Sequence, residues 1–170
     1  AICKAYHIED CYYTYAEYKD LGDFNRLQKY INEAEEYSTL TLYRNYTFTP
    51  GFDENLTEGI VIDKPLTINS SGHTINALEK ARIFNINANN VVLNNITFTN
   101  ANASGDGGAV YFYGNGIVTN CNFIDNSAQH GGAIYLKGNG TVTNCNFVNN
   151  SASVYSSAIN MGYGTVTNCR

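Results

Sequence analysis

The chain has 170 residues, a formal net charge of −5, and only 15% charged residues. This weakly acidic composition offers no basic groove, which excludes nucleic acid as an expected partner. No apolar run reaches the roughly 18 residues of a membrane-spanning helix, so no transmembrane segment is expected.

The first 36 residues differ from the rest of the chain. Residues 1–50 hold nine of the 14 tyrosines and eight of the 15 acidic residues, which separates this region from the polar, weakly charged remainder. Within it, Phe24, Leu27, Ile31 and Ala34 follow helical spacing behind Asp23, which is the predicted N-cap. We expect residues 1–36 to be a Tyr-rich leader and a helix that caps the repeats after it.

Short strand-like segments follow the helix at loose spacing. They are rich in Leu, Ile, Val, Thr and Phe, and Gly, Asn and Ser separate them. No helical period is present in this part of the chain. The segments lie at 40–43, 46–48, 66–68, 74–75, 82–86 and 93–98.

The second half of the chain repeats itself every 24 residues. Gly-Gly-Ala-Val-Tyr at 107–111 returns as Gly-Gly-Ala-Ile-Tyr at 131–135, and Val-Thr-Asn-Cys ends at residues 121, 145 and 169. A fixed period of this size is typical of a solenoid, and about 24 residues suffice for three short strands and three bends. The sequence therefore predicts an all-β parallel solenoid of five to six coils over residues 37–170.

Stacked coils place matching residues above one another. We expect Cys121, Cys145 and Cys169 to form one inward column, and Phe98, Phe123 and Phe147 its neighbour. Val142 and Cys145 are both core-type although they are three apart, which requires a bend at 143–144. Asn tolerates left-handed backbone and its amides can stack, although exposed turn polarity is the alternative explanation for these asparagines.

The five cysteines fall into two groups. The column Cys121, Cys145 and Cys169 is interpreted as reduced, small and hydrophobic. Its spacing is not that of a zinc site, no histidine accompanies it, and stacked thiols do not converge tetrahedrally, so no metal is expected. Cys3 and Cys11 are eight apart in a polar segment and are candidates for a disulfide in an oxidising exterior.

Low charge and abundant asparagine agree with an extracellular, cell-surface location. Asn-x-Ser/Thr triplets, which matter only in a secreted protein, are candidates for N-glycosylation. A chain this rich in Asn, Ser and Thr also forms such triplets by chance. The candidates are Asn45, Asn55, Asn69, Asn95, Asn102, Asn139 and Asn149.

No catalytic constellation is recognisable, so neither an enzyme nor a cofactor is expected. Glycoside hydrolysis needs two carboxylates within about 5–10 Å. Asp106 and Asp125 fall in different parts of the coil. His73 and His130 are each interpreted as a lone, solvated turn histidine. Beyond residue 100 the charged residues are Asp106, Asp125, Lys137 and Arg170.

Gly-Gly-Ala followed by Phe-x-x-Asn, at 123–126 and 147–150, resembles the repeats of chlamydial polymorphic outer-membrane proteins. The fuller pattern over about 24–170 resembles the adhesin-like surface proteins of methanogenic archaea. That resemblance implies a right-handed, pectate-lyase-like parallel β-helix, export and a role at the cell surface, with no defined catalytic residues. The leader at 1–20 departs from the pattern, and family members usually have many more coils.

Three functional hypotheses follow. In the first, an adhesin-like protein binds other surface proteins or glycans through its solenoid face, with Tyr113, Tyr155 and Tyr163 as the candidate surface; ordinary solenoid surface is the alternative explanation for them. In the second, the chain is a structural subunit that self-associates end to end through its C-terminal coil into a filament or sheath. The third is a polysaccharide lyase or hydrolase.

Overall fold

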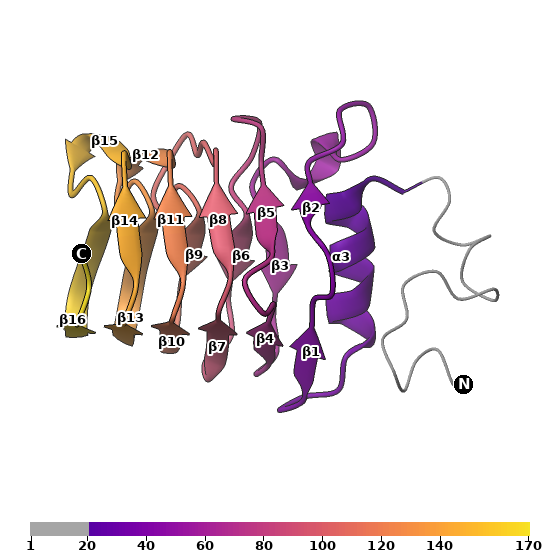
Figure 1. The fold of residues 1–170 in the computed structure, drawn as a ribbon, viewed down its shortest axis with the longest axis horizontal. Helices are drawn as coiled ribbons and strands as arrows, with labels where there is room; N and C mark the ends of the chain where they lie inside the picture. Colours follow the sequence, from indigo (N-terminus) through magenta and orange to yellow (C-terminus); the bar gives the residue numbers. More distant parts are fainter. Residues whose placement is uncertain (1–20) are drawn as a thin grey trace.

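Strands of successive turns pair in parallel and stack into a solenoid of about five turns (Figure 1). The structure is a computed structural model that describes residues 21–170. It confirms the predicted parallel β-solenoid. The predicted period is also confirmed, because Gly116 pairs with Gly140 and Phe123 with Phe147, each one 24-residue step away.

Each turn has three faces, which we number in chain order. Face 1 consists of β1 (Thr39–Thr41), β4 (Thr67–Asn69), β7 (Val91–Asn94), β10 (Gly116–Thr119) and the second halves of β13 (Ile134–Thr143) and β16 (Ile159–Thr167). Face 2 consists of β2 (Tyr46–Thr47), β5 (Thr74–Asn76), β8 (Thr97–Thr99), β11 (Asn122–Ile124) and β14 (Asn146–Val148). Face 3 consists of β3 (Ile60–Ile62), β6 (Phe84–Ile86), β9 (Val110–Phe112) and the first halves of β13 and β16.

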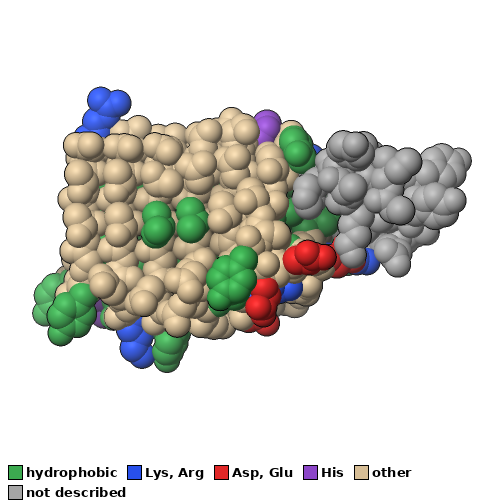
Figure 2. All heavy atoms as spheres, turned by 90° about the horizontal axis from the view of Figure 1, so that it is seen from below, with side chains coloured by type: hydrophobic (Ala, Val, Ile, Leu, Met, Phe, Trp, Pro, Cys, Tyr) green, Lys and Arg blue, Asp and Glu red, His purple; other side chains and the backbone are tan. Residues whose placement is uncertain are grey.

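A short pair of strands, β12 (Ser127–His130) and β15 (Ser151–Tyr155), lies between faces 2 and 3. A 3-10 turn, η1 (Glu54–Leu56), belongs to the first coil. Figure 2 shows the solenoid from face 1, where rows of uncharged side chains cover the coils and charged side chains lie at the margins. No helix in residues 21–170 has both the length and the apolar character that crossing a bilayer requires.

The core consists of columns of identical or similar side chains. Phe98, Phe123 and Phe147 stack with ring centroids 4.9 and 5.0 Å apart and nearly parallel planes. This is the predicted phenylalanine column. Spacing close to the strand separation of about 4.8 Å shows that the rings follow the backbone ladder without lateral displacement.

Asparagines in left-handed conformation turn the chain from face 1 to face 2. Asn95, Asn120 and Asn144 have φ of 56°, 55° and 54°, which confirms the bend expected at 143–144. Side chains at and just before these bends also form amide ladders, since Asn120 Nδ2 donates to Asn94 Oδ1 at 3.0 Å. The polar corner residues therefore set the backbone geometry and link neighbouring coils.

The Gly-Gly pairs are required where the backbones of neighbouring coils nearly touch. Gly107 and Gly131 have φ of 69° and 62°. A Cβ on Gly108 would lie 2.0 Å from the carbonyl oxygen of Gly132, so any larger residue clashes with the next coil. This contact explains the repeated Gly-Gly-Ala sequence without a catalytic role.

The capping helix α3 (Asp23–Glu33) covers the first coil and buries Phe24, Leu27 and Ile31 (Figure 1). Its existence and apolar stripe agree with the prediction. The predicted N-cap was wrong: Gly22 holds that position, and Asp23 is the first helical residue. Asp23 instead accepts a hydrogen bond from the Thr47 amide at 2.9 Å.

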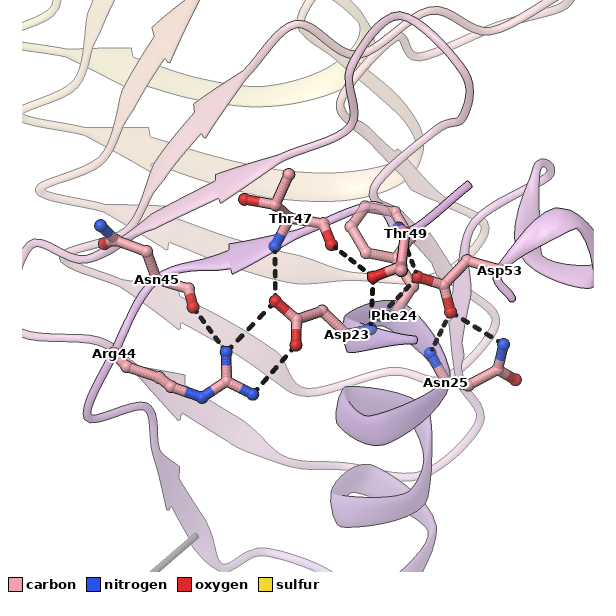
Figure 3. Close-up of polar contacts among 8 residues, drawn as sticks. All are labelled: Asp23, Phe24, Asn25, Arg44, Asn45, Thr47, Thr49 and Asp53. Carbon is pink, nitrogen blue, oxygen red and sulfur yellow. Dashed lines mark hydrogen bonds and ion pairs between the residues drawn. The ribbon is translucent and has the colours of Figure 1, made fainter. Parts of the chain in front are cut away.

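The carboxylate of Asp53, from the loop before η1, caps the helix (Figure 3). It is fully buried and accepts hydrogen bonds from the backbone amides of Phe24 at 3.1 Å, Asn25 at 3.0 Å and Thr49 at 2.8 Å. A Cβ on Gly22 would lie 2.3 Å from Asp53 Oδ1, which excludes a larger residue there. One carboxylate thus fastens the cap to the first coil.

Candidate functional site

Two exposed tyrosines, Tyr113 and Tyr163, lie two coils apart along the corner between faces 3 and 1, and we call this region the aromatic corner. It comprises Tyr113, Asn115, Lys137, Asn139 and Tyr163. Tyr113 follows β9 directly, and its ring lies 4.2 Å from the Lys137 ammonium. Tyr163 is the register partner of Asn139 in the next coil. The exposed fractions, 54% for Tyr113 and 78% for Tyr163, leave both rings open to a ligand.

A shallow groove of about 230 Å³ adjoins this corner, lined by Asn90, Asn115, Gly116, Ile117, Asn139, Gly140 and Thr141. The Oδ1 atom of Asn115 accepts the backbone amide of Asn139 at 2.9 Å, and Asn89 Oδ1 accepts that of Asn115 at 2.8 Å. These bonds fix the Asn115 and Asn89 side chains. The groove therefore offers positioned amides beside exposed rings.

Lys137 supplies a positive charge at the same corner. The neighbouring Tyr113 side chain raises the pKa of the lysine, so the ammonium stays protonated at neutral pH. Because Lys137 is on the surface, its charge is also available to an anionic group of a ligand.

Tyr111 and Tyr135 form a ladder in the middle of face 3. Their rings are parallel at 5.2 Å, and the Arg82 guanidinium lies 5.5 Å from the Tyr111 ring centroid. Burial raises the pKa of the Tyr111 hydroxyl. The Tyr111 ring centroid also lies 5.6 Å from the Tyr113 ring centroid, so the ladder adjoins the aromatic corner. The repeated Gly-Gly-Ala-x-Tyr sequence was the signal that could have located this ladder.

Tyr155 lies apart from the other two candidate tyrosines, at the edge between faces 2 and 3. It stacks on His130 with ring centroids 5.6 Å apart. His130 Nδ1 in turn lies 2.5 Å from Asp106 Oδ1. The interpretation of His130 as a lone, solvated histidine was therefore wrong. Asp106 and His130 are 24 residues apart, so the repeat itself placed them in adjacent coils.

The Asp106–His130 pair holds an imidazole in one orientation, which is one component of acid–base chemistry. Within residues 21–170, no Ser, Thr or Cys side chain donates a hydrogen bond to either member. The Asp106 backbone carbonyl accepts from Arg82 Nη2 at 2.8 Å. The pair is thus built into the connections between coils.

Arg82 is buried and links three consecutive coils. Its guanidinium donates to the carbonyls of Gly107 at 3.0 Å, Glu58 at 2.8 Å and Asp106 at 2.8 Å. Burial lowers its pKa, and the nearby Glu58 carboxylate opposes that effect. Because the ordinary pKa of an arginine lies far above neutral pH, the lowered pKa still leaves the guanidinium charged, and Arg82 acts as a fixed structural cation.

The cysteine column lies where faces 1 and 2 meet. Cys121 and Cys145 are buried, Cys169 is partly buried, and all three are free thiols. Burial raises the pKa of Cys121 well above its usual range, and the adjacent Cys121 thiol lowers the pKa of Cys145 to about 7. In residues 21–170 no three His, Cys, Asp or Glu side chains form a group suited to a metal ion. Cys3 and Cys11 lie outside the described residues.

Six of the seven sequon asparagines are exposed, and Asn69 is half-buried. Three of the side chains have hydrogen-bond partners. Asn45 Oδ1 accepts from the Thr74 amide, Asn55 Nδ2 donates to Asn25, and Asn69 Oδ1 accepts from Asn94. The structure thus favours Asn95, Asn102 and Asn149 as attachment points. The Asn139 side chain also makes no hydrogen bond within residues 21–170, but it lines the groove, which a glycan attached there would block.

No protein-family model, curated protein or solved structure matches this chain. The geometry of the aromatic corner and its groove is therefore the basis for a functional proposal.

Proposed function

We propose that this chain is a non-catalytic binding module of an extracellular, adhesin-like surface protein, and that the aromatic corner binds a glycan. The observation that carries the proposal is the position of two exposed rings, Tyr113 and Tyr163, beside an amide-lined groove. Flat aromatic surface with a few oriented polar groups is the usual composition of a small-ligand site. The rings would cover the apolar side of a sugar while the amides bind its hydroxyls.

Lys137 narrows the class of glycan. Its ammonium lies against Tyr113, within the same corner as the groove residues Asn115 and Asn139. A carboxylate or sulfate on a sugar ring would pair with this charge, so we propose acidic polysaccharides as the preferred ligands.

The surface location is proposed on composition and on the resemblance described above. Four sequon side chains stand free on the solenoid, and few charges cover the coils (Figure 2). Both features suit a secreted repeat protein. Antibody labelling of intact cells of the source organism would test this location, and signal only after permeabilisation would contradict it.

End-to-end assembly is retained as the alternative proposal. The last coil presents partly buried apolar side chains, namely Phe147, Ile159, Met161 and Cys169. In earlier coils the next coil covers the side chains at the corresponding positions. A second copy or a further coil of a longer chain would fit the same surface. Size-exclusion chromatography of the 170-residue chain over a range of concentrations separates monomers from filaments and decides this alternative.

The glycan proposal is tested on a polysaccharide array with the purified chain and a Tyr113→Ala, Tyr163→Ala double variant. Removing two central aromatic contacts should weaken binding by about tenfold or more. Tyr43→Ala is the matched control, because Tyr43 is 56% exposed and lies near the cap. Equal loss in the control, or no ligand for the wild-type chain, would contradict the proposal. Lys137→Ala should weaken the binding of acidic ligands and leave that of neutral ligands unchanged.

A further inference from the structure

Face 1 carries a regular outward array, which we call the threonine face. Its six strands pair in unbroken register along the stack. The column between the rows, including Leu40, Ile68 and Leu93, points inward and is buried, so the residues on either side point outward. The first row is Thr39, Thr67, Val92, Ile117, Thr141 and Thr165, and the second is Thr41, Asn69, Asn94, Thr119, Thr143 and Thr167.

Threonine is much more frequent in this array than in the chain as a whole. Eight of its 12 positions are threonine, although the whole chain has 15. Val92 and Ile117 keep the β-branched shape where the hydroxyl is absent. The face therefore repeats one shape, a methyl group beside a hydroxyl, in nearly every coil.

The array is rigid and has two fixed spacings. Rows are about 6.7 Å apart along a strand, and coils are about 4.8 Å apart along the axis. Ten of the 12 side chains, all but Asn69 and Asn94, are branched at Cβ, which restricts χ1 and holds them in position. In residues 21–170 none of the eight threonine hydroxyls has a protein hydrogen-bond partner, whereas the Thr97 hydroxyl on face 2 accepts from Asn122. The face 1 hydroxyls are therefore available to a ligand.

The face has neither charge nor aromatic rings. All 12 array side chains are uncharged, and Figure 2 shows charged side chains only at the margins of this face. A neutral face suits a neutral partner, and the absence of rings distinguishes it from the aromatic corner. The partner it fits is flat, periodic and composed of hydrogen-bonding groups at comparable spacings.

We propose that the threonine face binds ice. Water molecules on the surface of hexagonal ice repeat at distances close to the two spacings of this array. The hydroxyls take the place of lattice water molecules, while the methyl groups order the water between them. The threonine face shares Ile117 and Thr141 with the groove of the proposed glycan site, but ice uptake and glycan binding are measured separately and with different variants, so either proposal can fail alone.

The test uses the 170-residue chain fused to a fluorescent protein. Ice is grown slowly in the solution, and the fraction of fluorescence held in the ice is measured, together with thermal hysteresis and crystal shape. The test variant is Thr141→Lys with Thr143→Lys, which puts two charges into the array at outward positions. The matched control is Thr97→Lys with Thr99→Lys on face 2, and far-UV circular dichroism checks the folding of each protein.

We expect the wild-type chain and the face 2 variant to enter ice and shape its crystals, and the face 1 variant to fall to the level of the fluorescent protein alone. A folded wild-type chain that ice excludes would overturn the proposal. Loss of ice uptake in the face 2 variant alone would also overturn it. Concentration-dependent dimers that Thr141→Lys abolishes, without ice uptake, would assign the face to a second copy and overturn it also. If Thr141→Lys unfolds the chain, Thr141→Ser, which loses only the methyl group, provides the same comparison.

Discussion

Replacing Asp53 with alanine should detach the capping helix from the first coil. The carboxylate accepts three backbone amides, and the Phe24 amide is buried among them. An unsatisfied buried donor costs about 1–3 kcal/mol, and loss of a helix cap costs about 1 kcal/mol. Because the Asn25 and Thr49 amides are only partly buried, we expect a total loss of about 3 kcal/mol in the free energy of unfolding. Asp53→Asn should cost about 1–2 kcal/mol, because it keeps one acceptor oxygen but removes the charge at the helix N-terminus.

The measurement is urea unfolding followed by far-UV circular dichroism. Asp63→Ala is the matched control, because Asp63 is exposed. Coils of a solenoid contact only their neighbours, so the damage should concentrate at the N-terminal end. Amide hydrogen exchange should therefore accelerate in β1 and β2 of Asp53→Ala and stay unchanged in β10 and β11.

An Asp53→Ala variant whose free energy of unfolding lay within about 0.5 kcal/mol of the Asp63→Ala value would refute this reasoning, since that is the usual range of surface substitutions. Uniform acceleration of exchange through all coils would refute its second part, because it would show that the stack unfolds as one unit.

Two further predictions concern the interior. Asn126 is fully buried, donates to the Phe98 carbonyl and to Asn150, and accepts from the Ala101 amide, so Asn126→Ala should lower the free energy of unfolding by about 3 kcal/mol. Urea unfolding measures this loss beside Gln129→Ala, a nearby exposed residue, and equal effects would contradict the role of these buried hydrogen bonds. Burial raises the pKa of Cys169, so its alkylation should be slower than that of a free thiol at pH 8 and should accelerate as the pH rises further. Mass spectrometry of the native chain should find Cys121 and Cys145 unmodified, and early modification of Cys121 would show that the column opens.

The sequence predicted the fold because its signals repeat in step with the coil. The 24-residue period fixed which residues lie above one another, and Phe123 over Phe147 follows from it directly. The bend at Asn144 was also predictable, because Val142 and Cys145 cannot both point inward on a straight strand. Each of these inferences uses only local geometry and the period.

Contacts outside that pattern were missed. Asp23 looks like an N-cap by local sequence, but the capping carboxylate comes from Asp53, which is 30 residues away. The Asp106–His130 pair has the 24-residue spacing, but Asp106 was considered only as a partner of Asp125, so the pair was missed. Asn126 belongs to the recognised Phe-x-x-Asn motif, but its burial depends on a carbonyl of the preceding coil. Such partners become visible only when the coils are placed in register.

In-register stacking has a consequence at the level of the gene. Where the step is 24 residues, a recombination event that deletes or duplicates one unit in frame leaves each remaining strand with a partner of the same type. Such an event changes the length of the rod by one layer and leaves the cap untouched. Lineages can therefore gain or lose layers without new mutations in the interior, and engineers can adjust the reach of this scaffold by copying a segment that it already contains.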